Sequence, residues 1–441
     1  MKSINRRQFL KGSISAATTF TLLSQGKTFA ANDKIIVGIM GLGGRGTDLA
    51  EKFAKRPDTQ IAYLCDVDTR SFARAREVVE ELQDVKPKLV KDFRKMLDDP
   101  DVDAIVNATP DHWHGLGTIM ACQAGKDVYV EKPLCHNIWE GRKMVEAARK
   151  YKRVVQVGLQ SRSCKELKSA VEYIRSGKLG DIYLVRVFNM MQLSSAPKGP
   201  ERPVPQGFDY DMWCGPAPKV PYSPGRWWTE RWDFGCGGIA GDAVHQIDLA
   251  RFIIDKAYPE TVCHAGGVFF FKDGREISDT QMVTYEYGKL TLIFEAALWT
   301  SYMKKTPPEI RDTDQIPDWR FNGTKIELLG SKGFMVYGRH GDGWQVHDSD
   351  GQLVHSACDR QGQDEHLNNF VDCIRSRQKP IADVEEGHLS TLLCHIANIS
   401  YRVGNQKLKF DPKTESFTNV EEANKYLKRK GRAPWIIPDE V

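Results

Sequence analysis

Apolar residues recur with two alternating spacings along the first half of the chain. Runs that are apolar on both faces are typical of strands buried in a parallel sheet, and stretches with a repeat near 3.6 residues are typical of helices. The predicted strands are residues 35–40, 61–65, 89–90, 102–108, 128–130 and 154–157, and the predicted helices follow residue 46 and cover 71–82, 93–97, 112–125 and 138–151. This alternation predicts an α/β Rossmann domain, a doubly wound parallel sheet, over residues 33–157.

From residue 158 onward the pattern changes to longer, alternating strands. Predicted strands cover residues 182–190, 261–271, 280–287, 290–300, 324–329 and 334–337, and predicted helices cover 166–176, 363–377 and 385–403. Such runs indicate a large open sheet, mostly antiparallel, with one exposed or partner-covered face. We therefore expect a C-terminal α+β domain for substrate binding and oligomerisation over residues 158–404. Residues 405–441 are expected to form a strap across the fold or onto another subunit.

Residues 1–30 have the composition of a targeting segment, with five basic residues and no acidic one. The sequence NRRQFLK at residues 5–11 resembles the twin-arginine export motif, with Asn5 where Ser or Thr is usual. The apolar stretch at residues 12–23 is too short and too polar to span a bilayer, and residues 28–30 offer a small-residue cleavage site. A disordered basic tail is the alternative. We expect a signal peptide, export to the periplasm and no membrane span.

Removing this segment changes the charge balance. The whole chain has 62 Lys+Arg and 58 Asp+Glu, and without the five leading bases 57 remain against 58. The mature chain therefore gives no indication of a nucleic-acid or anionic-membrane partner. The ten cysteines form no C-x-x-C pair, so neither a metal site nor a disulfide framework is expected. This cysteine usage suits folding in a reducing cytosol, and the twin-arginine route carries folded proteins.

A glycine motif follows the first predicted strand. Gly41, Gly43 and Gly46 have the spacing G-x-G-x-x-G, which permits a tight turn, a close approach of a pyrophosphate and close packing of the next helix. The second strand ends in Asp66, 20 residues beyond Gly46, where a carboxylate can accept the ribose hydroxyls and repel a 2′-phosphate. An ordinary glycine turn is the alternative. The context of strand, turn, helix, strand and acid predicts a dinucleotide site.

Three further motifs occur in this half of the chain, and the first and the last lie at the predicted cofactor edge of the sheet. They are TPDHWH at residues 109–114, AGK at 124–126 and EKP at 131–133. Together they resemble the signature of the Gfo/Idh/MocA oxidoreductases, a family that includes glucose-fructose oxidoreductase and inositol dehydrogenase. The resemblance is strong over residues 33 to 160 and looser to about 410. It implies that Lys132 and His114 are the family's lysine and histidine, and that the open sheet pairs with a neighbouring subunit, making a homo-oligomer.

The chemistry of Lys132 supports a catalytic interpretation independently. A lysine at the carboxyl edge of a parallel sheet can hydrogen-bond a substrate hydroxyl or ketone oxygen and stabilise alkoxide character during hydride transfer. A surface lysine at a strand end is the alternative.

The segment at residues 237–248 resembles the part of the family that carries a catalytic histidine. His245 matches that histidine, and Asp248 matches an acid three residues later. Gly241 replaces the acid usual four residues before the histidine, and Asp242 follows it, displaced by about 100° on a helix. A loop conformation could restore the pairing. As a neutral imidazole, His245 can accept a proton from a sugar hydroxyl, whereas a buried helix-capping histidine is the alternative.

Residues 194–235 form a proline- and tryptophan-rich insert. It contains eight prolines and four of the ten tryptophans. Indole rings stack on the apolar faces of sugars, which favours a sugar-binding role. A structural lid that packs on the core or on a partner subunit is the alternative.

These observations define a candidate site without a metal. The predicted cofactor is NAD, with NADP as the alternative. Its predicted contacts are Gly41, Leu42, Gly43, Gly44, Arg45, Gly46, Asp66, Thr109, Pro110, His114, Glu131 and Lys132. The predicted catalytic residues are Lys132, His245, Asp242 and Asp248. The predicted substrate contacts are Lys132, Arg162, Trp228, Arg231, Asp242 and His245.

Three functions are compatible with this site. The first is an exported oxidoreductase that acts on a sugar, polyol or glycoside and keeps its NAD tightly bound, because little free NAD should be available beyond the inner membrane. The second is an NAD-dependent glycoside hydrolase or lyase that oxidises the sugar transiently, although the histidine segment of glycosidase family 109 is not found. The third is a non-enzymatic binder, which the presence of both Lys132 and His245 disfavours.

Overall fold

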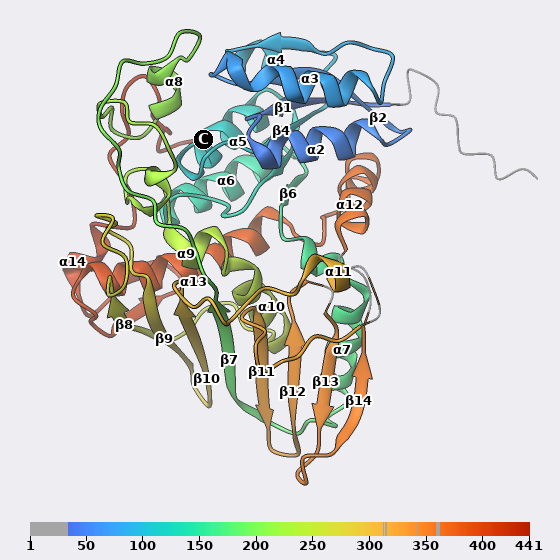
Figure 1. The fold of residues 1–441 in the computed structure, drawn as a ribbon, viewed down its shortest axis with the longest axis vertical. Coiled ribbons are helices and arrows are strands. Elements are labelled where there is room, and N and C mark those ends of the chain that lie inside the picture. Colours follow the sequence, from blue (N-terminus) through green and yellow to red (C-terminus); the bar gives the residue numbers. More distant parts are fainter. Residues whose placement is uncertain (1–33, 312, 314, 341, 359–361) are drawn as a thin grey trace, which may run out of the picture.

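The structure is a computed structural model that describes residues 34–311, 313, 315–340, 342–358 and 362–441. The predicted signal peptide lies outside the described residues. Two sheets dominate the fold, one in each half of the chain, and Figure 1 shows them one above the other with the N-terminal half at the top. Buried apolar side chains from both halves belong to one continuous core. No helix among the described residues is long and apolar enough to cross a membrane.

The N-terminal sheet has six strands in the order β3-β2-β1-β4-β5-β6, and all neighbours are parallel. This confirms the predicted doubly wound sheet. The strand order changes direction between β1 and β4, where the carboxyl ends of the strands form the ligand-binding edge of such sheets. The strands are β1 (Ile35–Met40), β2 (Thr59–Cys65), β3 (Lys88–Val90), β4 (Ala104–Asn107), β5 (Asp127–Val130) and β6 (Val155–Val157).

Helices cover both faces of this sheet. Those from the N-terminal half are α2 (Gly44–Ala54), α3 (Phe72–Glu80), α4 (Arg94–Leu97), α5 (Asp111–Gln123) and α6 (Ile138–Lys150). A late helix, α12 (Gln363–Ser376), joins them, because its Phe370 packs in one cluster with Phe53 and Tyr129. The sequence pattern placed α12 with the second domain. Its apolar stripe instead completes the core of the first domain, beside α2 in Figure 1.

The second sheet has ten strands in the order β14-β13-β12-β11-β7-β10-β9-β8-β15-β16. Within this second sheet, β7 and β10 are the only described strands that pair in parallel, so the sheet is mostly antiparallel as predicted. The bounds are β7 (Ile182–Met190), β8 (Thr261–Gly267), β9 (Thr280–Tyr287), β10 (Leu290–Ala297), β11 (Lys325–Gly330), β12 (Gly333–Gly338), β13 (Trp344–His347), β14 (Leu353–Ala357), β15 (Leu408–Asp411) and β16 (Ser416–Phe417). The last four were missed, because they are short and lie toward the two edges.

One face of this sheet is packed and the other carries exposed apolar side chains. Helices α7 (Lys165–Arg175), α10 (Val244–Ile254) and α13 (Val384–Arg402) are the long helices of this half. The hydroxyl of Tyr285 on β9 donates to the carbonyl oxygen of Leu393 on α13 at 2.9 Å, which holds α13 against the sheet. Tyr183 and Met282 are half exposed, at 52% and 50%. A partly apolar surface is therefore left on the sheet.

The insert and the C-terminal segment are both ordered parts of the fold. The insert contains α8 (Tyr210–Cys214) and a short 3-10 helix, η4 (Trp227–Glu230), and it precedes α9 (Gly237–Gly241). Its aromatic side chains form a small core of their own. After β16 the chain passes through α14 (Glu421–Asn424) and reaches the N-terminal half, where Trp435 packs on Trp113 with ring centroids 5.1 Å apart. Residues 405–441 thus contact both halves of the molecule.

Candidate active site

The glycine turn joins β1 to α2 and leaves room for a phosphate group. Gly41 has a φ of +89°, which favours glycine, and a Cβ on Gly46 would lie 1.8 Å from the carbonyl oxygen of Gly41. A side chain at Gly46 would therefore separate α2 from the strand, whereas a Cβ on Gly41 would lie 2.7 Å from the carbonyl oxygen of Ala108. A Cβ on Gly43 or Gly44 would meet no described atom within 4 Å. Helix α2 begins at Gly44, beside this open space, and a helix N-terminus attracts anions.

Asp66, at the end of β2, stands beside this turn. Its Oδ2 accepts a hydrogen bond from the Leu42 amide at 2.7 Å, and its Oδ1 accepts one from the Asp68 amide at 2.9 Å. Burial raises the pKa of the Asp66 carboxyl, and the two amide hydrogen bonds oppose that shift. Each carboxylate oxygen has more than one acceptor site, so both can also bind ribose hydroxyls. The carboxylate is thus oriented by the same turn that forms the phosphate cradle.

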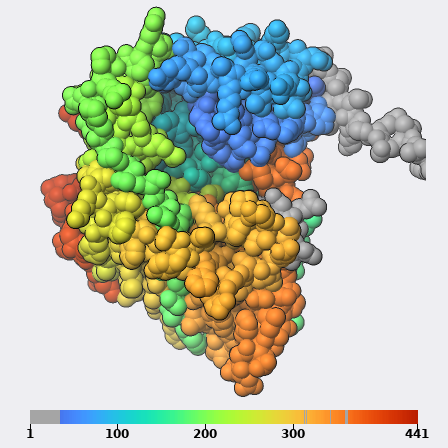
Figure 2. Space-filling model, in the orientation of Figure 1, coloured from blue at the N-terminus to red at the C-terminus, as the bar shows by residue number. Residues whose placement is uncertain are grey.

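A cleft of about 580 Å³ connects the glycine turn with the turn that carries the EKP motif. Its wall on the N-terminal side includes Asp66, Thr109, Pro110, Glu131 and Lys132. The opposite wall comes from the insert. Figure 2 shows the hollow between the insert, in green, and the N-terminal half, in blue. The volume and the shape of the glycine turn fit a bound dinucleotide.

The insert lies directly over this cleft. Trp213 and Trp228 line it, together with Met212 and Arg226. Two backbone hydrogen bonds tie the insert to the loop after β2: the Thr69 amide donates to the Gly207 carbonyl at 3.2 Å, and the Asp209 amide donates to the Val67 carbonyl at 2.9 Å. The insert therefore packs as a structural unit and also forms one wall of the cleft, whereas its role in sugar binding stays a prediction.

The turn after β5 positions Lys132 at the far end of the cleft. Its ammonium Nζ donates a hydrogen bond to the carbonyl oxygen of Gly241 at 2.7 Å. Glu131 supports this turn, because Oε1 accepts from Arg45 Nε at 2.7 Å and Oε2 accepts from the Lys132 amide at 3.2 Å. Burial alone would raise the pKa of Glu131, but the charges of Arg45 and Lys132 lower it below its usual value. Arg45 is thus held by the carboxylate beside the cradle.

His114 joins two of the cleft turns from behind. It is 1% exposed, with Nδ1 lying 2.6 Å from the carbonyl oxygen of Pro133 and Nε2 lying 2.8 Å from that of Thr109. His114 is not among the residues that line the cleft. Where the sequence predicted a cofactor contact, the structure places a residue that positions the TP and EKP turns relative to each other.

Asp242 lies between two helices. Helix α9 ends at Gly241 and α10 begins at Val244, so the displacement expected for a continuous helix does not apply. Oδ1 of Asp242 accepts from Lys305 Nζ at 2.6 Å, and Oδ2 accepts from Arg339 Nη1 at 3.0 Å. Burial would raise the pKa of this carboxyl, but the charges of Arg339 and Lys305 lower it. Asp242 is therefore ionised and held by two cations.

His245 lies on the first turn of α10 and is 7% exposed. Its amide lies 3.4 Å from the carbonyl oxygen of Asp242, and no hydrogen bond joins the two side chains in the described structure. The imidazole is neutral, because burial lowers its pKa well below the usual value and the nearby charges of Arg339 and Lys132 lower it further. The expected carboxylate partner of His245 is thus engaged elsewhere, while the imidazole itself remains a proton acceptor.

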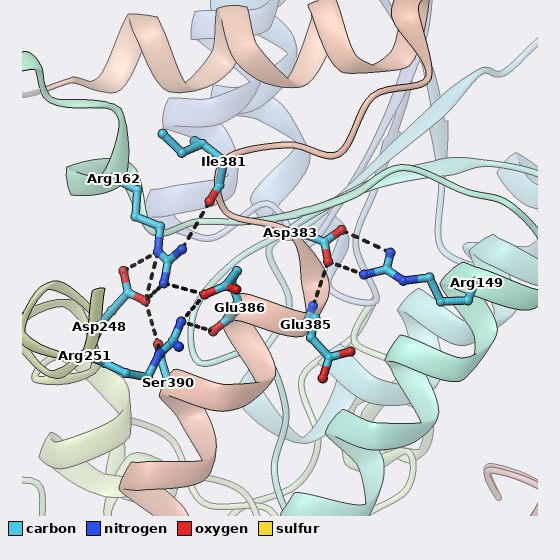
Figure 3. Close-up of polar contacts among 9 residues, drawn as sticks. All are labelled: Arg149, Arg162, Asp248, Arg251, Ile381, Asp383, Glu385, Glu386 and Ser390. Atoms are coloured by element: carbon cyan, nitrogen blue, oxygen red, sulfur yellow. Dashed lines mark hydrogen bonds and ion pairs between the residues drawn. The ribbon is translucent and has the colours of Figure 1, made fainter. Parts of the chain in front are cut away.

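Two other predicted site residues lie in the interior. The guanidinium of Arg162 donates to both carboxylate oxygens of Asp248, and each of these side chains is 1% exposed. Figure 3 shows them in a network with Ser390 and Glu386, and Arg251 contributes a second guanidinium. A buried pair of this kind is costly to break but adds little direct chemistry. The structure therefore places Arg162 and Asp248 together, away from the cleft wall.

Arg231 also lies outside the cleft lining. Its Nη1 is 3.6 Å from Oε1 of Glu276, and its side chain is 22% exposed. Of the substrate contacts predicted from sequence, Lys132 and Trp228 line the cleft, and Asp242 and His245 lie close to Lys132.

Sequence reasoning missed three basic residues at the catalytic end. Lys305, Arg339 and His340 come from the second domain and surround Asp242, which lies 63 residues before Lys305 and 97 before Arg339. No local motif joins positions so far apart, and isolated lysines and arginines are common on surfaces. Among the described residues, no cluster of three His, Cys, Asp or Glu side chains could hold a metal ion.

The fold and this cleft define the class of NAD-binding oxidoreductases with a Rossmann domain. The model of the "Oxidoreductase family, NAD-binding Rossmann fold" matches residues 35–159, and that of the family's C-terminal alpha/beta domain matches residues 188–266 and 331–437. The chain belongs to the Gfo/Idh/MocA oxidoreductase family. The resemblance found in the sequence motifs is thereby confirmed, and NAD is the cofactor of the class.

The individual relatives and solved structures have low sequence identity to this chain. Myo-inositol 2-dehydrogenase of Thermotoga maritima is 24% identical over 372 residues, which are 82% of this chain and 95% of that protein. Glycosyl hydrolase family 109 protein 2 of Shewanella sp. (strain ANA-3) is 30% identical over 171 residues, which are 34% of this chain and 38% of the relative. A solved levoglucosan dehydrogenase, in complex with NADH and levoglucosan, has a TM-score of 0.64 at 18% identity and covers 85% of this chain and 99% of its own.

Proposed function

We propose that this protein is an exported oxidoreductase that transfers hydride between a tightly held NAD and a hydroxyl or ketone carbon of a sugar, polyol or glycoside. The observation that carries the proposal is the position of Lys132, which lines the NAD cleft and touches the segment that carries Asp242 and His245. The relatives named for inositol and levoglucosan support a substrate with CH–OH groups.

The chemistry at this end of the cleft comes from two side chains. When bound, the nicotinamide supplies the hydride acceptor. Lys132 presents an ammonium group that stabilises negative charge on the substrate oxygen. His245 presents a neutral imidazole that can accept the proton of the hydroxyl. Asp242 keeps Lys305 and Arg339 in place beside them.

Tight retention of NAD is supported by the insert. Trp213 and Trp228 form the wall of the cleft opposite the glycine turn, and the insert is bonded to the loop after β2, next to Asp66. Such a wall slows dissociation, because the insert must move before the cofactor can leave. Together with the twin-arginine-like sequence at residues 5–11, this slow dissociation favours loading of NAD before export. Each cycle then returns the hydride, to a second substrate or to the same sugar.

Retention is tested by measuring nucleotide in the purified mature protein. After gel filtration and denaturation, we expect about one NAD per chain in the supernatant. Trp213→Ala should lose the nucleotide during gel filtration, whereas Trp319→Ala, outside the cleft, should retain it. An apo protein whose activity requires stoichiometric added NAD would contradict the proposal.

The alternative is an NAD-dependent glycoside hydrolase or lyase. The 171-residue similarity to a family 109 glycosyl hydrolase favours it. In that reaction, transient oxidation of one sugar carbon acidifies its neighbour and permits elimination. Release of an aglycone without an oxidised sugar product would identify this chemistry. An oxidised sugar product, formed together with NADH or with a reduced second substrate, would identify a dehydrogenase.

We also propose that a second copy of the chain covers the apolar face of the large sheet. The half-exposed Tyr183, Met282 and Leu353 support this arrangement. Light scattering should then give a mass that is a multiple of the chain mass, and a monomer would exclude it.

A further inference from the structure

Among the described residues, the cluster that adjoins Lys132 at the end of the cleft carries more positive than negative charge. The ammonium groups of Lys132 and Lys305 and the guanidinium of Arg339 surround a single ionised carboxylate, that of Asp242. We infer that the substrate is an anionic sugar, whose carboxylate or phosphate group binds Lys305 and Arg339. This inference rests on the proposed function and specifies the substrate class of the same site.

Neighbouring charges of the described residues do not remove this excess. Glu131 is close to Lys132, but its carboxylate is bonded to Arg45. Asp342 lies next in the cluster, but its carboxyl is bound by Thr306 and Asn322, and burial raises its pKa. Arg311 is close enough to Asp342 and His340 to influence their pKa values, so it offsets any negative charge there. Uncompensated charges that are partly buried are costly, and a bound anion removes that cost.

Arg339 and Lys305 also have donors to spare. Arg339 uses Nη1 for Asp242 and for Gln246 Oε1, whereas its Nε and Nη2 make no hydrogen bond within the described chain. These two nitrogens form the fork that binds carboxylate or phosphate oxygens in pairs. Lys305 has three N–H donors and gives one to Asp242. The Arg339 side chain is 8% exposed, and neither of these two nitrogens is among the fully buried unpaired atoms, so an anion can reach them.

His340 adds an unpartnered polar group to the same cluster. It is 4% exposed, and neither ring nitrogen has a hydrogen-bond partner in the described structure. Buried polar groups are rarely left unpaired, so such a group indicates a missing partner. There is also space for a ligand beside Gly241, whose carbonyl oxygen accepts the hydrogen bond from Lys132. A Cβ on Gly241 would meet no described atom within 4 Å.

The excess positive charge opposes the protonation of His245 during catalysis. To act as a base, the imidazole must become a cation while Lys132, Lys305 and Arg339 are already charged. A neutral sugar leaves this repulsion uncompensated. An anionic group held by Lys305 and Arg339 favours the imidazolium, so binding of the correct substrate also activates the base.

The test compares matched sugars on the NAD-loaded protein. Glucose, glucuronate and glucose 6-phosphate, and the corresponding galactose set, are measured by calorimetric binding and by kcat/KM. We expect one anionic member to exceed its neutral counterpart at least tenfold in both readouts. Lys305→Gln should abolish that preference and Lys305→Arg should restore most of it. Lys304→Gln, which removes the exposed adjacent charge, should leave it unchanged.

The outcomes separate the inference from the proposed function. A preference for glucuronate or galacturonate identifies a carboxylate, and a preference for the 6-phosphates identifies a phosphate. Equal or tighter binding of neutral sugars, no binding of any anionic sugar, or equal effects of the Lys305 and Lys304 variants would overturn the inference. Anion binding that depends on Lys305, without any redox turnover, would support the inference while contradicting the proposed function.

Discussion

Replacing Lys132 with Met should lower kcat by about 100-fold or more while NAD remains bound, as for removal of one oxyanion-type donor. Methionine keeps most of the side-chain length and apolar volume but removes the positive charge that stabilises the substrate oxygen. The nucleotide contacts of the glycine turn and Asp66 lie elsewhere in the cleft, so the bound NAD should be unaffected. Single-turnover rates, together with the NAD content of the variant, measure both effects.

Lys168→Met is the matched control for this prediction. Lys168 is exposed on α7, outside the cleft, so its replacement should change neither rate nor NAD content. A Lys132→Met enzyme with near-normal turnover would show that the substrate oxygen is stabilised by another group. Loss of NAD together with activity would instead assign Lys132 to cofactor binding.

Replacing His245 with Asn should lower kcat/KM by about 10²- to 10⁴-fold, the usual contribution of a general base. Asparagine retains a polar group of similar length but cannot accept the proton at neutral pH. His355→Asn, on the exposed edge strand β14, is the control and should have normal rates. A His245→Asn enzyme that loses less than tenfold would indicate that another group, or water, accepts the proton.

The pH profile gives a second test of the same role. The folded-state pKa of His245 is lowered well below about 6.5, first by burial and then by the charges of Arg339 and Lys132. The imidazole is thus already unprotonated at pH 6.5, and it gains a proton only as the pH falls through the lowered value. We expect kcat/KM to stay level through pH 6.5 and to fall at lower pH, provided the protein remains folded. A midpoint near 6.5 would contradict this assignment.

The sequence alone was sufficient for the N-terminal half, because its signals are local. The largely apolar runs at β1 and β4 predict buried parallel strands, and the glycine spacing follows from contacts within one turn, such as that between Gly46 and Gly41. Lys132 could be predicted for the same reason, since its place at a strand end is set by the chain on either side of it.

Features that depend on distant parts of the chain were decided by the tertiary structure. Helix α12 was assigned to the second domain and packs on the first, because amphipathicity does not specify which surface will cover an apolar stripe. Arg162 and Asp248, 86 residues apart, neutralise each other in the interior instead of facing the cleft. Lys305, between β10 and β11, and Arg339, directly after β12, lie beside Asp242 through the packing of the second domain. The sequence determined which residues could perform the chemistry, whereas packing of the two halves determined which charges surround them.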